Sequence, residues 1–140
     1  QEPFLHHPPP KSTGRDLFNP AWLAAALARF PMARPADVPA TLTELTASAC
    51  AESASSYEKY SKILAVCGGG ALNTHLMQRL QALLPGVSVV PTDDLGLPAM
   101  QVEAAAFAWL ARQTLLGQTG NLQSVTGAKG ARVLGAVYPA

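Results

Sequence analysis

The sequence predicts an α/β domain organised around one βαβ unit with parallel strands. Its first strand is the unbroken apolar run from Ile63 to Cys67, which is typical of a strand buried on both faces of a parallel sheet. Three glycines follow, and leucines then recur at helical spacing until Pro85 and Gly86 end the helix. A second apolar run over residues 87–91 completes the unit, and its crossover should be right-handed.

Further helices and one more strand are expected on either side of this unit. Asn19 before Pro20 signals a helix with an Asn N-cap, which Pro31 should stop. Asn73 should precede the crossover helix. Apolar spacing also predicts helices over about 39–54 and 98–116, a long loop over 117–130 and a terminal strand over 132–138. The long helix is expected to turn these residues inward: Val102, Ala106, Phe107, Trp109 and Leu110.

Composition excludes several classes of protein. The 140 residues are 49% hydrophobic and 14% charged, and the net charge of +1 comes from scattered cations. This pattern disfavours a nucleic-acid surface and an anionic membrane partner. No apolar run is long enough for a transmembrane helix, and no signal peptide is expected. Cys50 and Cys67 are too isolated for a disulfide framework or a metal site, so a reducing cytoplasm is expected.

The proline-rich start reads as a connection from another domain. We therefore expect residues 1–18 to form an interdomain connection and entry loop, and residues 19–140 to form a C-terminal α/β nucleotide-binding domain of a longer protein. His6 and His7 have no third ligand nearby, so no metal site is expected. The polar cluster 11–16 suits either a phosphate contact or an ordinary loop.

The glycine turn Gly68, Gly69 and Gly70 is the main candidate site. It and the loop 92–96 both follow strands at their carboxyl ends, where ligands of open α/β sheets bind. Without Cβ atoms the turn lets backbone approach a nucleotide closely. The alternative is a tight turn that binds nothing. Neither a Walker A lysine nor the spacing of a dinucleotide fold accompanies the glycines.

Acidic residues give a weaker signal. Glu103 should share a helix face with Phe107 and Leu110, so it either binds a ligand at a cleft wall or lies partly exposed where the helix dipole favours it. Asp93 and Asp94 suit a metal or sugar hydroxyls, although loop capping is the commoner use. No Ser-His-Asp arrangement is present.

Several short sequence blocks together indicate a protein family more specifically than any one of them does. From about Pro10 to Ala140 their order and spacing resemble the anhydro-N-acetylmuramic acid kinases. The blocks are Lys11–Asn19, Val66–Ala71, Gly96–Pro98, Val102–Ala104, Ala106–Ala111, Gly120–Leu122 and Val125–Ala128.

The resemblance implies the C-terminal half of an actin-like (ribonuclease H-like) ATPase fold, with mostly parallel central strands flanked by helices. It further implies a cytoplasmic kinase of peptidoglycan recycling that uses ATP and Mg²⁺. Such an enzyme opens 1,6-anhydro-N-acetylmuramic acid with water and phosphorylates O6, which gives N-acetylmuramic acid 6-phosphate and ADP.

By the same resemblance, Gly68, Gly69 and Gly70 pass close to ribose and adenine, and Glu103 meets the sugar. The phosphate loop, the general base and the magnesium site belong to an N-terminal domain of the same protein, so no catalytic residue is assigned here and the fragment alone should be inactive. Leu72 and Thr74 occupy positions where many relatives have His and Pro. This difference affects the shape of the chain where it leaves the glycine turn. The resemblance leaves open whether the protein forms a homodimer. The alternatives are another sugar kinase of the superfamily and a non-catalytic nucleotide-binding module.

Overall fold

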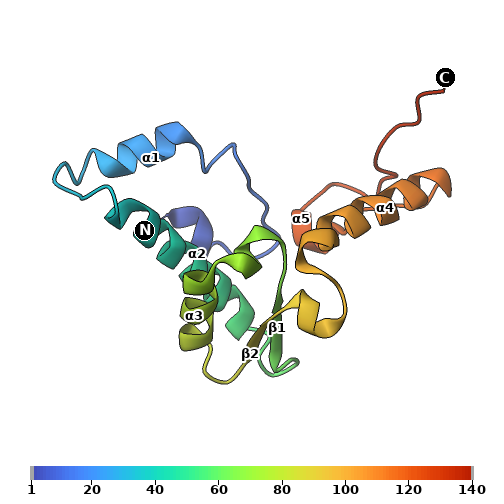
Figure 1. The fold of residues 1–140 in the computed structure, drawn as a ribbon. Coiled ribbons are helices and arrows are strands. Elements are labelled where there is room, and N and C mark those ends of the chain that lie inside the picture. The colour runs from blue at the N-terminus through green and yellow to red at the C-terminus, as the bar shows by residue number, and fades with distance from the viewer. Residues whose placement is uncertain (1, 140) are drawn as a thin grey trace. The chain divides into compact units, whose positions relative to one another are not determined.

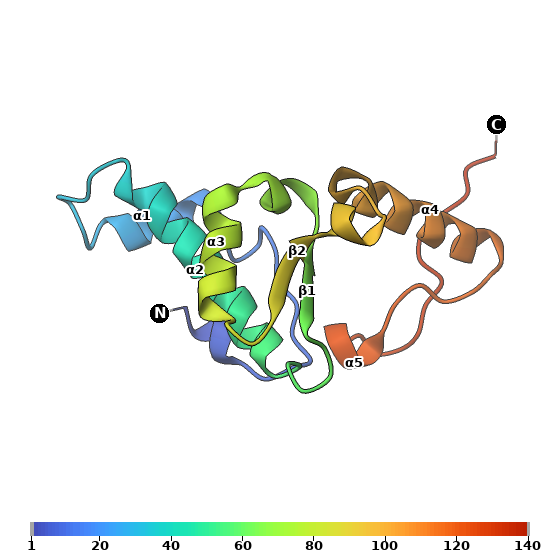
Figure 2. The same ribbon diagram turned by 60° about the horizontal axis from the view of Figure 1, so that its bottom comes forward.

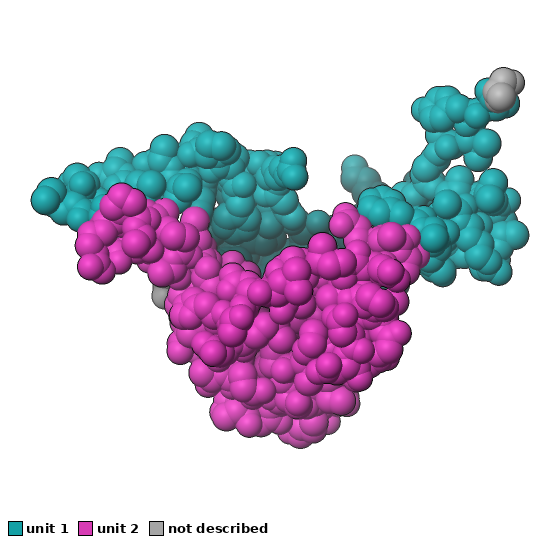
Figure 3. All heavy atoms as spheres, in the orientation of Figure 1, with its two compact units in different colours: residues 1–33, 106–140 teal, residues 34–105 magenta. Residues whose placement is uncertain are grey.

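The computed structural model describes residues 2–139, and the chain forms two compact units. One unit comprises residues 34–105, and the other comprises residues 1–33 with 106–140 (Figure 3). Figure 1 labels the elements in chain order: α1 (Pro20–Leu27), α2 (Asp37–Ser55), β1 (Ile63–Val66), α3 (Thr74–Leu83), β2 (Ser88–Pro91), α4 (Val102–Leu115) and α5 (Gln123–Thr126).

The predicted βαβ unit is confirmed within residues 34–105. Strands β1 and β2 pair in parallel, with Ile63 opposite Ser88 at one end and Val66 opposite Pro91 at the other. Helix α3 connects them and begins after Asn73, as expected. The fold class is therefore α/β, and this arrangement is compatible with part of an actin-like fold.

Helices α2 and α3 pack against each other on one side of the two strands (Figure 1, Figure 2). The core of this unit is small. Ala51 of α2 packs with Leu84 and Val87, and Leu64 and Val89 of the strands lie partly buried against them. All the buried hydrophobic residues among residues 2–139 belong to this unit: Ala47, Ala51, Leu80, Leu84, Val87 and Ala99.

The prediction that the first strand is buried on both faces is wrong for the described structure. Leu64 faces the helices, but Ile63 on the opposite face is 50% exposed. The reason is topological, because the sheet has two strands here and one helical layer covers only one of its faces. The apolar run encodes two apolar faces, and the second remains uncovered in residues 34–105.

The long helix also differs in detail from its prediction. A short 3-10 turn over Ala99–Gln101 precedes α4, so the α-helix begins at Val102 rather than at Pro98. Phe107 and Trp109 were expected to face inward, yet they are 63% and 50% exposed. Helical spacing identifies which residues share a face, but it does not supply the element that would cover that face.

The N-terminal segment of the other unit is held by side-chain bonds. Asn19 caps α1 as predicted, because its Oδ1 accepts a hydrogen bond of 2.9 Å from the Trp22 backbone N–H. The Trp22 indole N–H donates to Glu2 Oε2 at 2.8 Å, and Phe18 packs edge-on against the indole ring. The helix ends at Leu27, before the predicted stop at Pro31.

The predicted terminal strand does not form, since residues 132–138 are irregular. They are held by individual bonds instead of a ladder. Asn121 Oδ1 accepts from the Arg132 N–H at 2.6 Å, and its amide donates to the Gly130 carbonyl at 2.9 Å. The Thr114 hydroxyl of α4 also bonds the Leu134 carbonyl. A β-prone sequence without a neighbouring strand finds other partners for its backbone.

Candidate functional site

The glycine turn lies at the carboxyl edge of the parallel strands, as predicted. Because Val66 pairs with Pro91, the chain leaves both strands at the same edge. Residues Gly68–Leu72 form a 3-10 turn after β1, and Thr92–Leu95 form another after β2. The glycine turn also packs against Ala99–Gln101, the segment that leads into α4. This edge therefore brings together the glycine turn, the acidic loop and the start of α4.

The three glycines have different structural roles. Gly68 has a φ of 67°, a left-handed conformation that favours glycine. Gly69 has no such constraint, and a Cβ built on it would meet no atom of residues 2–139 within 4 Å, its two chain neighbours aside. A Cβ on Gly70 would lie 3.4 Å from Leu76 Cδ2, which is ordinary contact. Neither backbone strain nor packing within the chain explains why position 69 is glycine.

Asn73 fixes the exit from this turn into α3. Its side-chain oxygen accepts a hydrogen bond of 3.1 Å from the Leu76 N–H, and its own N–H donates to the Gly70 carbonyl at 3.1 Å. The Asn cap therefore uses one of the free N–H groups of the helix end. Gly69 is the exposed glycine of the turn, so its backbone is open to a ligand.

The acidic loop after β2 is mainly structural. Asp93 Oδ2 accepts a hydrogen bond of 3.1 Å from the Ala99 N–H, so this carboxylate caps the loop, as the commoner interpretation expected. Thr92 was not singled out from the sequence. Its hydroxyl is buried and has no hydrogen-bond partner among residues 2–139. Its only sequence signal is a polar residue directly after a strand.

Glu103 is the second residue of α4 and is exposed. Within residues 2–139, no group forms a hydrogen bond or an ion pair with its carboxylate. It follows the Ala99–Gln101 turn that packs against the glycine turn. Its position in the first helical turn suits the helix dipole, and its open carboxylate suits hydrogen bonding to a ligand.

The polar cluster 11–16 forms internal loop contacts. The Lys11 ammonium donates to the Leu5 carbonyl at 2.7 Å and lies 5.5 Å from the centroid of the Phe4 ring. The Gly14 N–H donates to Asp16 Oδ1 at 2.8 Å. These bonds support the interpretation of an ordinary loop.

Residues 2–139 bring no three His, Cys, Asp or Glu side chains together in a group that could hold a metal ion. Among the helices of the described residues, none combines the length and hydropathy needed to cross a bilayer.

Known proteins match the whole chain. A family model described as anhydro-N-acetylmuramic acid kinase matches residues 1–140. The anhydro-N-acetylmuramic acid kinase of Variovorax paradoxus (strain S110) is 65% identical over 99% of this chain and 37% of its own length. Proteins of the same name from Albidiferax ferrireducens and Cupriavidus pinatubonensis are 60% and 57% identical, over 36% and 37% of their lengths. The chain thus spans little more than a third of these relatives, and it belongs to the anhydro-N-acetylmuramic acid kinase family.

Proposed function

We propose that this chain is the C-terminal, ATP-side part of a cytoplasmic kinase that acts on 1,6-anhydro-N-acetylmuramic acid. The reaction adds water across the anhydro bond and transfers the γ-phosphoryl group of ATP to O6. The products are N-acetylmuramic acid 6-phosphate and ADP. Family membership over residues 1–140 supports the reaction class, and the names of the relatives support the sugar.

The observation that carries the nucleotide assignment is the open space at Gly69. Glycine costs conformational entropy on folding, so a glycine without strain or packing needs another reason. A Cβ on Gly69 would project into space that residues 2–139 leave empty, at the edge of the sheet where α/β proteins bind ligands. Close approach of a nucleotide to the backbone supplies that reason.

Each candidate residue has one role in this proposal. The backbone of Gly68, Gly69 and Gly70 passes along the ribose and adenine of ATP, and the Glu103 carboxylate accepts a hydrogen bond from the sugar. Phosphoryl transfer depends mainly on positioning and electrostatics. The general base, the phosphate loop and the Mg²⁺ ligands are assigned to an N-terminal domain outside this chain.

An ADP-release assay on the full-length protein tests the proposal. Anhydro-N-acetylmuramic acid should support turnover, whereas N-acetylglucosamine, glucose and buffer without sugar should not. Turnover with a different sugar would keep a kinase but discard the substrate. Absence of turnover with all of them would leave a nucleotide-binding module as the better account.

The isolated 140-residue chain provides the matching control. It should release no ADP from ATP under any of these conditions, because the base and the metal ligands are assigned elsewhere. ATP hydrolysis by this chain would contradict that division of roles.

A further inference from the structure

A carboxylate joins the loop after β2 to the segment that precedes α4. Asp93 Oδ2 accepts a hydrogen bond of 3.1 Å from the Ala99 N–H, the first N–H of the 3-10 turn Ala99–Gln101. A donor at the start of a helical turn has no partner within that turn. The residue before it is Pro98, whose side chain cannot accept a hydrogen bond. Asp93 therefore supplies the cap that Pro98 lacks, from six residues earlier in the chain.

The loop that carries Asp93 is itself anchored to the sheet. Its 3-10 turn Thr92–Leu95 follows β2 directly and contacts both β1 and β2. The Gly96 N–H donates to the Asp93 carbonyl at 3.0 Å, and the Leu97 N–H donates to the Thr92 carbonyl at 3.1 Å. The backbone position of Asp93 is therefore set by the two strands and by these bonds.

The other partner of the bond lies beside the glycine turn. Ala99 is only 3% exposed, and the segment Ala99–Gln101 packs against Gly68–Leu72. Three consecutive glycines have more backbone freedom than other residues, so the turn needs support from its neighbours. The Asn73 N–H bond to the Gly70 carbonyl holds its end, and the Ala99 segment supports it from a separate element.

These contacts form a closed path through the unit. Strand β1 leads into the glycine turn, and the turn packs against the Ala99 segment. That segment is bonded to Asp93, which follows β2, and β2 pairs with β1. The Asp93 carboxylate is the side-chain link in this path, so its removal should loosen the glycine turn.

We infer that Asp93 is a positioning residue, which holds the glycine turn in the arrangement that binds the nucleotide and does not touch the nucleotide itself. This inference rests on the proposed role of the turn and adds to it a residue that acts through Ala99. The acceptor oxygen is the feature that matters, because the Ala99 N–H needs an acceptor and not a charge.

Equilibrium binding of ADP with Mg²⁺ to the full-length protein, measured by calorimetry, tests the inference. In Asp93→Ala the Kd for ADP should rise about threefold or more, because a smaller fraction of the turn is in the binding arrangement. Asp93→Asn should bind ADP nearly as the parent does, since its amide oxygen can accept the same hydrogen bond from Ala99.

Amide hydrogen exchange of the nucleotide-free protein, read by NMR, reports on the turn directly. In Asp93→Ala the amides of Ala99 and Asn73 should both exchange about tenfold or more faster than in the parent. The Asn73 amide is the informative one, because its bond lies in the glycine turn and not at Asp93. Asp93→Asn should restore the protection of both amides.

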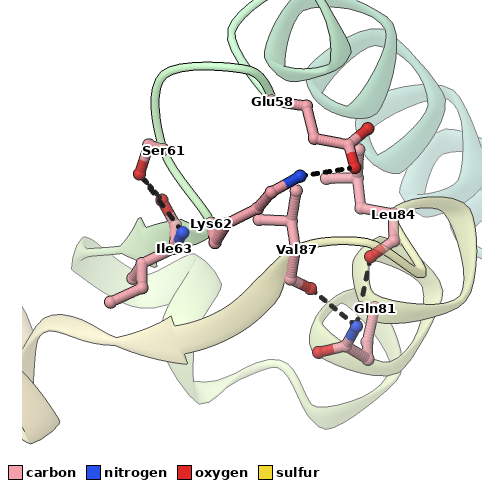
Figure 4. Close-up of polar contacts among 7 residues, drawn as sticks. All are labelled: Glu58, Ser61, Lys62, Ile63, Gln81, Leu84 and Val87. Atoms are coloured by element: carbon pink, nitrogen blue, oxygen red, sulfur yellow. Dashed lines mark hydrogen bonds and ion pairs between the residues drawn. The ribbon is translucent and has the colours of Figure 1, made fainter.

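Gln81→Ala separates positioning from a general loss of stability. The Gln81 amide donates to the Leu84 carbonyl at 3.3 Å and to the Val87 carbonyl at 2.9 Å (Figure 4). Val87 precedes β2 and Asp93 follows it, so this variant removes hydrogen bonds of the same unit at the opposite end of the strand. It should leave the Kd for ADP unchanged.

Three binding results would overturn the inference. The first is an unchanged Kd in Asp93→Ala. The second is equal weakening in Asp93→Ala and Asp93→Asn, which would mean that the charge of Asp93 meets the ligand. The third is equal weakening in Gln81→Ala. A parent protein that binds no ADP would refute the proposed function, and the Asn73 amide would still decide whether Asp93 holds the turn.

Discussion

Arg79 of α3 forms a two-bond ion pair with Glu44 of α2. The distance from Arg79 Nε to Glu44 Oε2 is 2.6 Å, and the distance from Nη2 to Oε1 is 3.0 Å. The hydrogen bonds from Arg79 hold the pKa of Glu44 below its usual value, although desolvation opposes this, and they raise the pKa of Arg79. This pair joins two helices that cover the same face of the sheet.

The variant Glu44→Gln should change how stability depends on pH. A lowered pKa in the folded state means that the carboxylate stabilises the fold above its usual pKa and loses this effect as pH falls through the folded value. The free energy of unfolding of the parent should therefore exceed that of the variant at about pH 7, and the difference should shrink toward about pH 3. Urea titrations across this range give the measurement.

A double-mutant cycle with Arg79→Gln is the control for that prediction. If the pair acts as a unit, the double variant should lose less stability than the sum of the two single losses. A difference between the parent and Glu44→Gln that does not vary with pH would contradict the assignment.

Gln81→Ala should destabilise the βαβ unit by about 1–2 kcal/mol, because hydrogen bonds to the backbone at Val87 and Val89 are lost. Gln78→Ala removes the same side chain from an exposed position on the same helix and should cost under about 0.5 kcal/mol. Equal losses in thermal unfolding would show that the Gln81 bonds contribute no stability.

Gly68→Ala and Gly69→Ala should affect stability differently. Alanine at position 68 must adopt a φ of 67°, which costs about 1–2 kcal/mol. Alanine at position 69 meets open space without a positive φ, so stability should stay within about 1 kcal/mol of the parent. Denaturant midpoints measure both, and a large loss for Gly69→Ala would mean that the glycine is structural.

Gly69→Val in the full-length kinase should raise the KM for ATP about tenfold or more, because the side chain takes the space assigned to the nucleotide. The KM for the sugar should change much less. Steady-state kinetics on a variant with unchanged thermal stability give the result. An unaltered KM for ATP would remove the turn from the nucleotide site.

Glu103→Gln should weaken use of the sugar and leave ATP affinity nearly unchanged, because the exposed carboxylate has no partner within residues 2–139. The expected loss in kcat/KM for the sugar is about tenfold, which corresponds to the free energy lost with one hydrogen bond to a charged group. Arg112→Gln, an exposed change of charge later in the same helix, is the matched control. Loss of folding instead of activity would favour a structural role for Glu103.

Features encoded by neighbouring residues could be predicted from the sequence. The caps at Asn19 and Asn73 depend on a polar side chain before a helical pattern, and both formed. The parallel pairing of β1 and β2 follows from a strand, a crossover helix and a second strand in succession. The position of the glycine turn follows from the same order of elements.

Features that depend on distant partners could not be predicted. Ile63 and Phe107 belong to apolar patterns, yet what covers them is not encoded nearby, and both are exposed here. The segment 132–138 has strand composition but no strand beside it in the described structure. The bonds from Gln81 to the backbone at Val87 and Val89 could not be predicted either, because a glutamine on a helix surface resembles any solvated residue. The roles of Gly69 and Glu103 in binding stay predictions.

The location of the core has a consequence for the order of folding during synthesis. All the buried hydrophobic side chains of residues 2–139 belong to the continuous segment 34–105, whereas the other unit combines both ends of the chain. A ribosome delivers residues 34–105 in one stretch, so their core can close while residues 106–140 are still being added. The other unit also needs residues 106–140, so a product truncated before them would leave Trp22 and its neighbours without the second segment of their unit.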